Sequence, residues 1–160
     1  MDQSVFLRYC RRLMERDCNC EDLRAILALQ AQFCQLCDLA RWDEMGELFL
    51  PDAVLHVFGK DYVGRDELVR FVARRHQGKH MLSVPDIVID GNTAFVTVDH
   101  AFFRYPDLVL FGVGVYRDVL QKVDGSWKFA RREIEVHGHH PEMTAVAKQK
   151  ITPIADTIAG

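Results

Sequence analysis

Hydrophobic residues in the first half of the chain recur at helical spacing. Between positions 21 and 38, one stripe advances in steps of three or four residues: Leu23, Leu27, Ala31, Cys34 and Asp38. Such steps place residues on one face of an α-helix, so an aspartate shares a face with apolar side chains near the helix end. Two further helices are predicted, one over 43–49 that Pro51 ends and one over 65–75.

The remainder of the chain is dominated by apolar runs separated by short turns. Each run has the length and composition of a β-strand. Three hairpins are predicted around turns rich in glycine and aspartate: Gly59-Lys60-Asp61, Asp90-Gly91-Asn92 and Asp124-Gly125-Ser126.

Helices followed by an antiparallel meander predict an α+β domain, with the N-terminal helices packed on a curved antiparallel sheet. The predicted strands are mostly apolar on both faces, so we expect a partner subunit to cover the outer face. We therefore expect a homo-oligomer, and the apolar outer face is compatible with either a dimer or a trimer.

Length, composition and charge limit the class of protein. The chain has 160 residues, of which 49% are hydrophobic and 27% charged, and its formal net charge is -3. These values fit one soluble domain and give no electrostatic reason to expect a nucleic acid or an anionic membrane as partner. The N-terminus does not resemble a secretory signal, so we expect a cytoplasmic protein. Residues 1–20 are interpreted as a helical extension, and 141–160 as a tail that covers a pocket mouth or a subunit interface.

Cysteine and histidine clusters raise the alternative of a metal site. Five cysteines cannot form a complete disulfide framework, and a zinc site would need thiolates to converge from Cys18, Cys20, Cys34 and Cys37. Because the last two fall within the predicted helix, we interpret them as buried, reduced cysteines. The histidines of 137–140 lie just past the last strand and are interpreted as solvated. We therefore predict neither a metal nor a cofactor.

Asp38 and His80 are the residues with the clearest catalytic potential. A carboxylate on an apolar stripe is costly to bury unless it is paired or functional, although Asp38 could simply cap the following turn. His80 begins a predicted strand after Gly78 and could equally be solvated. If the two side chains meet, the aspartate would orient the imidazole and stabilise the imidazolium formed when histidine removes a proton.

Several short segments resemble the SnoaL-like members of the nuclear transport factor 2-like superfamily, in the order that the family has them. They are Cys37–Asp43, Leu50–Ala53, Lys79–Met81, Tyr116–Asp118 and Val123–Ala130. The resemblance runs from about position 22 to 136. It implies a cone-shaped fold that encloses one pocket.

The resemblance also implies a type of chemistry. Scytalone dehydratase, bile acid dehydratase and hexachlorocyclohexane dehydrochlorinase use an Asp-His pair that falls on Asp38 and His80. It thus implies a cofactor-independent lyase or isomerase that removes a carbon-bound proton. Two alternatives remain: a polyketide cyclase, which should lie beside polyketide synthase genes, and a binding or assembly module in which the pair is structural.

The remaining candidate residues concern the substrate. Tyr116 or His100 would donate to the substrate oxygen, and Arg104 is interpreted as a rim residue. Val57 stands where the two dehydratases have a strand tyrosine, and Phe33 stands where bile acid dehydratase has a helix tyrosine, which disfavours scytalone or a bile acid as substrate. We expect a small, mostly apolar or aromatic cyclic substrate. The remaining residues expected to line the pocket are Trp42, Phe102 and Gly114. The missing side chain of Gly114 would leave room for a ligand or mark tight packing.

Overall fold

The computed structural model describes residues 20–74 and 78–141. An α+β arrangement is confirmed, in which helices pack on a curved sheet of seven strands. The predicted N-terminal extension and C-terminal tail lie outside the described residues, apart from their innermost residues, Cys20 and Pro141. No helix in the described part of the chain is both long enough and apolar enough to cross a membrane.

Helix α2 (Cys20–Asp38) has the predicted extent, but a different stripe of its surface enters the core. The most deeply buried apolar residues are Ile26, Leu29, Phe33 and Cys37, whereas Leu27 remains 45% exposed. The start of the helix is fixed from a distance, because the indole Nε1 of Trp127 donates a 2.7 Å hydrogen bond to Asp22. The stripe predicted from spacing is therefore the one beside the main buried face.

The next elements form one end of the molecule. They are α3 (Trp42–Gly46), β1 (Phe49–Val57), β2 (Lys60–Val63) and α4 (Arg65–Ala73). Pro51 lies inside β1 and does not end a helix, which corrects the sequence-based boundary. The strand tolerates this proline because the pairing of β1 with β7 is interrupted between Phe49 and Val54, where no ladder hydrogen bond is needed.

The other strands build the main sheet. They are β3 (Gly78–Leu82), β4 (Asp86–Asp90), β5 (Thr93–Arg104), β6 (Val109–Val123) and β7 (Ser126–His139). The strand order is β2-β1-β7-β6-β5-β3, and β4 also pairs with β5. All neighbouring strands are antiparallel except β1 and β7, which run parallel. The sheet is therefore mixed, which corrects the prediction of a purely antiparallel sheet.

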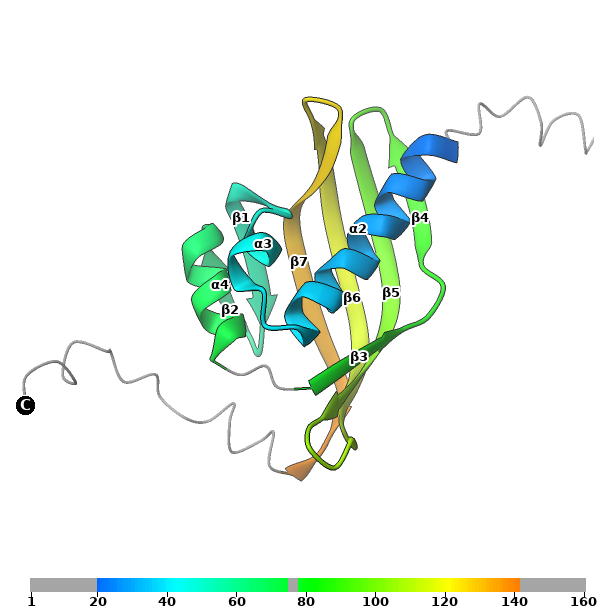
Figure 1. Ribbon diagram of the computed structural model, residues 1–160. Helices are drawn as coiled ribbons and strands as arrows, with labels where there is room; N and C mark the ends of the chain where they lie inside the picture. The colour runs from blue at the N-terminus through cyan, green and yellow to red at the C-terminus, as the bar shows by residue number, and fades with distance from the viewer. Residues whose placement is uncertain (1–19, 75–77, 142–160) are drawn as a thin grey trace, which may run out of the picture.

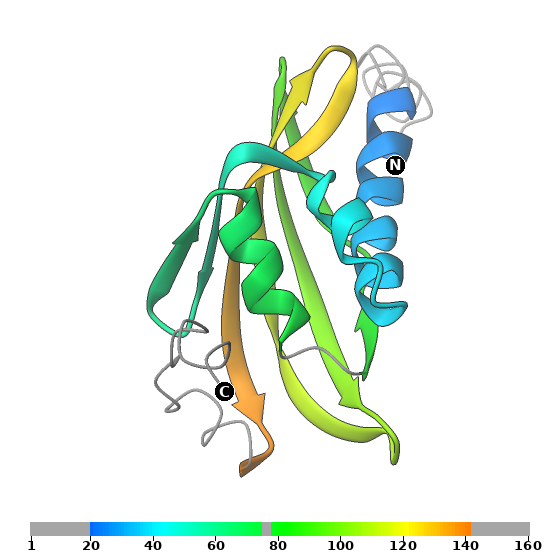
Figure 2. The same cartoon turned by 60° about the vertical axis from the view of Figure 1, so that its left-hand side comes forward.

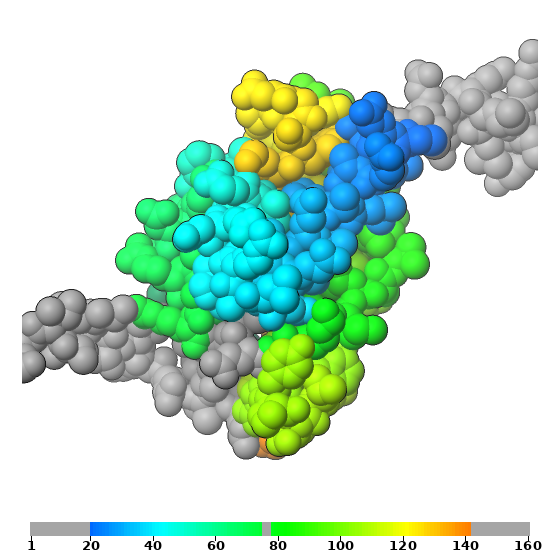
Figure 3. All heavy atoms as spheres, viewed as in Figure 1, coloured from blue at the N-terminus to red at the C-terminus, as the bar shows by residue number. Residues whose placement is uncertain are grey.

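The helices lie on one side of the curved sheet (Figures 1 and 2). Helix α2 crosses over β5, β6 and β7, while α3 and α4 lie beside β1 and β2 (Figure 1). In the space-filling view, the side chains of α2 cover this face of the sheet (Figure 3). Burying this interface removes a continuous apolar cluster from water, including Ile26, Leu55, Leu68, Leu120 and Phe129. This packing fixes α2 against the sheet and thereby the position of Asp38 at its end.

The opposite face of the sheet is more polar than the sequence pattern suggested. Along β5, exposed positions alternate with buried ones from Ala94 to His100, and they include Thr97 and Asp99. Arg117 and Glu135 form a 2.7 Å ion pair on the same face. Exposed apolar side chains are also present, among them Phe95 and Val113. Coverage of this face by a partner subunit stays a prediction.

Candidate functional site

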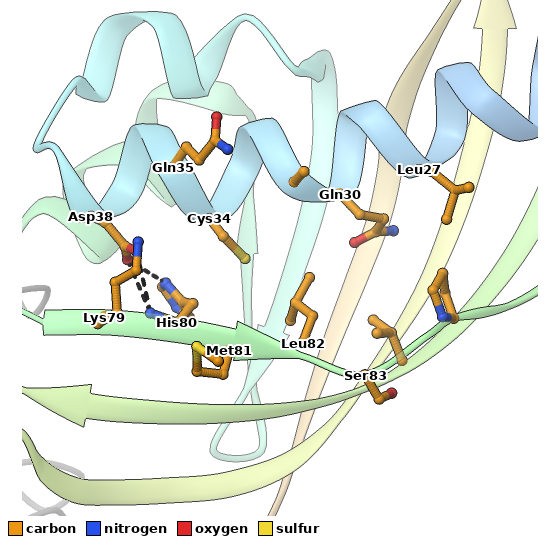
Figure 4. Close-up of a pocket in the computed structure, with 13 residues that line it drawn as sticks. Leu27, Gln30, Cys34, Gln35, Asp38, Lys79, His80, Met81, Leu82 and Ser83 are labelled. Carbon is orange, nitrogen blue, oxygen red and sulfur yellow. Dashed lines mark hydrogen bonds and ion pairs between the residues drawn. The ribbon is translucent and has the colours of Figure 1, made fainter.

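Asp38 is the last residue of α2, and backbone hydrogen bonds close the turn that follows. The N–H of Leu39 donates to Gln35, that of Ala40 to Cys37, and that of Arg41 to Leu36. Ala40 has a φ of 55°, the left-handed conformation typical of a helix C-terminus. The carboxylate contacts β3, which lies directly beneath the helix end (Figure 4).

Asp38 and His80 meet, although 42 positions separate them in the chain. The distance from His80 Nδ1 to Asp38 Oδ1 is 2.9 Å, and the backbone N–H of His80 donates to both carboxylate oxygens at 3.2 and 3.3 Å. The side chains are only 5% and 7% exposed. The carboxylate thus fixes the position of the imidazole ring through both the backbone and the side chain of His80.

Lys79 is a third member of this cluster that the sequence analysis did not single out. Its ammonium lies 2.9 Å from Asp38 Oδ2, on a side chain that is half exposed. Burial alone would raise the pKa of Asp38, but the hydrogen bonds from His80 and Lys79 outweigh it and lower the pKa to about 2. The carboxylate is therefore ionised throughout the neutral range.

We expect this cluster to stabilise the fold above about pH 4 and to lose its effect as the pH falls towards 2. A carboxylate whose pKa is lower in the folded than in the unfolded chain stabilises the fold only while it is ionised. A shift from the ordinary 3.8 to about 2 corresponds to about 1–2 kcal/mol, because part of the effect is screened at the exposed Lys79. The measurement is the free energy of urea unfolding from pH 7 to 2 for the parent and for Asp38→Asn. A difference between the two proteins that does not change with pH would contradict this assignment.

The walls around His80 are apolar and aromatic. The His80 ring lies 5.1 Å from the ring centre of Phe102 and 6.1 Å from that of Phe33. The His80 side chain also lines a cavity of about 310 Å³ between α2 and β3 (Figure 4). Leu27, Ala31, Cys34 and Asp38 of the predicted helix stripe all line this cavity. That stripe is thus the cavity face of α2, which explains why it is less buried than its neighbour.

Cys34 lies in the same cavity wall but is poorly suited to act as a nucleophile. Burial raises the pKa of its thiol to about 12, so the thiolate needed for attack is scarce at neutral pH. Cys37 is also buried, and its pKa is raised by the same cause. No group of three or more potential metal ligands occurs among residues 20–74 and 78–141, and Cys18 of the zinc alternative lies outside them.

Tyr116 and His100 form a stacked pair on the inner face of the sheet. Their ring centres are 4.0 Å apart and their planes differ by 13°. Burial raises the pKa of Tyr116 well above its ordinary value, so its phenol stays protonated. Burial, together with the charge of His80, lowers the pKa of His100 to about 4, so this imidazole is neutral near pH 7. Neither residue lines the cavity between α2 and β3, but the ring of Phe33 lies near both Tyr116 and His80, with ring centres 6.3 and 6.1 Å apart.

A buried charged network next to this pair was missed entirely by the sequence analysis. Arg132 donates to Asp118 through Nε at 2.8 Å and Nη2 at 2.7 Å, and both side chains are fully buried. Burial disfavours charge on Arg132, but the adjacent Asp118 raises its pKa. The guanidinium lies over the rings of Phe33, Tyr116 and Phe129 at 4.1–4.4 Å. Gln30 of α2 completes the network and also lines the cavity.

The other predicted pocket residues are distributed more widely. Val57 is a core residue of β1, Trp42 packs on the edge of the core, and Arg104 lies 4.8 Å above the ring of Phe111. A Cβ on Gly114 would lie 2.0 Å from the carbonyl oxygen of Glu135 and 3.0 Å from His100, so tight packing accounts for this glycine.

The predicted histidine cluster does not converge on one point. His137 pairs with Glu135 at 2.9 Å, whereas His139 Nδ1 lies 3.1 Å from the backbone oxygen of His140. The ring of His140 in turn stacks on Phe111, with 6.1 Å between their centres. The three histidines are therefore divided among separate contacts at the end of β7.

Comparison with known proteins supports the fold and identifies the type of domain. The profile of the SnoaL-like domain matches residues 19–133. A provisionally assigned scytalone dehydratase from Novosphingobium aromaticivorans is 26% identical, with 76% of this chain and 88% of that chain covered and a TM-score of 0.65.

Two further structures share the fold at lower identity. A protein of unknown function with a cystatin-like fold from Nostoc punctiforme is 23% identical, covering 76% of this chain and 95% of that chain, with a TM-score of 0.71. The beta subunit of a provisionally assigned aromatic-ring-hydroxylating dioxygenase from Novosphingobium aromaticivorans is 16% identical, covering 73% and 90%, with a TM-score of 0.62. The architecture of this chain therefore occurs in proteins of different kinds.

Proposed function

This chain belongs to the SnoaL-like domain family, and we propose that it is a cofactor-independent lyase or isomerase of the dehydratase type. The observation that carries the proposal is the 2.9 Å contact between two almost completely buried side chains, Asp38 and His80, at the wall of a largely apolar cavity. The similarity to a provisionally assigned scytalone dehydratase supports the same type of reaction.

His80 acts as the base in this mechanism. Asp38 accepts a hydrogen bond from Nδ1–H of His80, which leaves the lone pair on Nε2 to take a carbon-bound proton next to a carbonyl group. The imidazolium that forms is stabilised by the ionised carboxylate of Asp38. It then returns the proton to another carbon, which completes an isomerisation, or to a departing hydroxyl, which completes a dehydration.

The oxygen that gains charge during proton removal needs a neutral donor nearby. Neither Tyr116 nor His100 lines the cavity between α2 and β3, but the pKa values keep Tyr116 protonated and His100 uncharged near neutral pH. Either could therefore donate a hydrogen bond to a substrate that reached beyond the cavity wall, without repelling the imidazolium of His80. His100 Nδ1 is buried and no described residue bonds to it. An unpaired buried nitrogen is costly, and a substrate oxygen or hydroxyl would satisfy it.

The lining of the site indicates the substrate class. Phe33 and Phe102 flank His80, and the cavity wall includes the apolar residues Leu27, Ala31 and Leu82 of α2 and β3. The cavity has the size of a small-molecule site. We therefore propose a small, mostly apolar cyclic ketone or a related metabolite as substrate.

The proposal is tested with 2-tetralone, an apolar cyclic ketone whose protons next to the carbonyl exchange slowly with D2O. The parent protein should accelerate deuterium incorporation, followed by proton NMR. His80→Ala should lower the catalysed rate by about 10²–10⁴-fold, the usual contribution of a positioned base. Loss of the base, and not of the fold, is checked by an unchanged circular dichroism spectrum.

The chain offers a matched control for this experiment. His56 and Asp61 form a second His-Asp pair at 2.5 Å, but on the exposed surface of the β1–β2 hairpin. His56→Ala should leave the exchange rate unchanged. If 2-tetralone is not exchanged faster than in buffer, or if His80→Ala matches the parent, His80 is not a carbon base.

A further inference from the structure

Gln30 is held in one orientation by the buried charged network. Its Oε1 accepts a 2.6 Å hydrogen bond from Arg132 Nη2, and its Nε2 donates a 2.7 Å hydrogen bond to Asp118 Oδ2. A guanidinium can only donate and an ionised carboxylate can only accept, so the amide oxygen must face Arg132 and the nitrogen must face Asp118. The amide therefore cannot rotate to exchange its two ends.

This arrangement leaves one donor unused at the cavity. An amide nitrogen carries two hydrogens, and Asp118 takes one of them. No other described residue accepts the second hydrogen of Gln30. The side chain lies in the cavity wall and leaves α2 on the same side as Cys34 and Asp38 (Figure 4). Because Gln30 is only 3% exposed, a ligand oxygen in the cavity would satisfy this N–H where bulk water has little access.

The position of Gln30 relative to Asp38 sets the geometry of such a ligand. The two residues are eight positions apart on one helix, which is about 12 Å along the axis at 1.5 Å per residue. Both line the same cavity, with the apolar residues Ala31 and Cys34 between them. A molecule that reached both ends would have its reacting carbon at His80 and a polar atom at the far end, joined by an apolar body.

We propose that Gln30 determines substrate specificity by donating a hydrogen bond to an oxygen at the end of the substrate remote from the carbon that loses its proton. This inference rests on the proposed function for the identity of the reacting end. The expected substrate is an apolar, roughly two-ring compound with a carbonyl group near His80 and a hydroxyl, carbonyl or ether oxygen at its far side.

The buried ion pair acquires a role in this arrangement. A salt bridge in the interior contributes little net stability compared with apolar residues of equal volume, because both charges must be desolvated. Arg132 and Asp118 instead hold the amide of Gln30 in one orientation, in which only its second N–H is left for a ligand. A donor fixed in advance loses less conformational entropy on binding, and it discriminates against ligands that cannot accept a hydrogen bond.

The test compares two ligands of similar size, 6-hydroxy-2-tetralone and 6-methyl-2-tetralone. Each carries its substituent on the ring remote from the ketone, and dissociation constants are measured by calorimetry. The parent should bind the hydroxy compound about 3–10-fold more tightly, the usual effect of one neutral hydrogen bond. Gln30→Met, which keeps the length of the side chain but has no donor, should bind the two compounds equally.

Gln35→Met is the matched control, because Gln35 lines the same cavity from the same helix but is exposed. It should retain the preference for the hydroxy compound. Retention of the preference in Gln30→Met, or its absence from the parent, would overturn the assignment.

A measurement on the parent protein covers the case in which Gln30→Met does not fold. The side-chain amide signal of Gln30 in a ¹⁵N-¹H spectrum should shift with the hydroxy compound and not with the methyl compound, and an equal response to both would contradict the proposal. Binding does not need proton transfer, so a failure of the deuterium exchange experiment would be distinguishable from a failure of this one.

Discussion

Replacing Asp118 with alanine is expected to lower the free energy of unfolding by about 3–5 kcal/mol. The substitution leaves the guanidinium of Arg132 fully buried without its counter-charge, which is among the most costly single changes in a protein interior. It also removes the acceptor of Gln30 Nε2, so a second buried polar group loses its partner. Because small domains are stable by only about 5–15 kcal/mol, this is a large share of the total.

Urea unfolding followed by circular dichroism measures this effect, with Glu135→Ala as the comparison. Glu135 pairs with Arg117 on the adjacent strand at the same 2.7 Å distance, but both side chains are about half exposed. Glu135 also pairs with His137 at the surface, and removing these exposed contacts should cost much less than removing Asp118. Equal losses for the two variants would show that burial does not set the strength of the inner pair.

The second large effect is expected from Asp38→Asn, which should slow the exchange of 2-tetralone by about 10²–10⁴-fold. Asparagine keeps the shape of the side chain but can present an N–H to His80 Nδ1. That N–H would favour the tautomer with the proton on Nε2, where the lone pair is needed. The substitution also removes the charge that stabilises the imidazolium. We expect the change in kcat with little change in KM, because Asp38 acts on the histidine and not on the bound ketone.

Asp61→Asn provides the control, since Asp61 contacts His56 through the same types of atom on the surface. It should leave the exchange rate as it is. The double variant Asp38→Asn with His80→Ala should be no slower than His80→Ala alone, because the two residues act as one unit. If Asp38→Asn retained the parental rate, or if the effects of the two substitutions multiplied, His80 and Asp38 would not share a function.

Local structure could be predicted from the sequence where it depends on residues that are neighbours along the chain. The three- and four-residue spacing predicted α2 and placed Asp38 at its end on the same face as Leu27 and Cys34, because the helical period is a property of the backbone. The Asp124-Gly125 turn was predicted for a similar reason. Both residues have positive φ angles, 49° and 77°, which such residues adopt most readily.

Residues that meet through an irregular register could not be found in this way. Extending the regular pairing from the β6–β7 turn would place Asp118 opposite Arg131. A bulge between Val119 and Leu120 shifts the register by one residue, so Asp118 faces Arg132. A shift of one residue exchanges the two faces of a strand, and no local pattern marked where the bulge would fall.

The sequence by itself determined the helix that carries Asp38, the strand that begins near His80 and most of the turns, because these depend on local backbone preferences. Only the tertiary structure decided which face of α2 is core and which is cavity, since burial depends on what packs against the helix. The contact of Asp38 with His80 and Lys79, and the network of Gln30 with Asp118 and Arg132, likewise depend on long-range packing. Charges can be buried there because the fold provides a partner for each, and no local segment contains both partners.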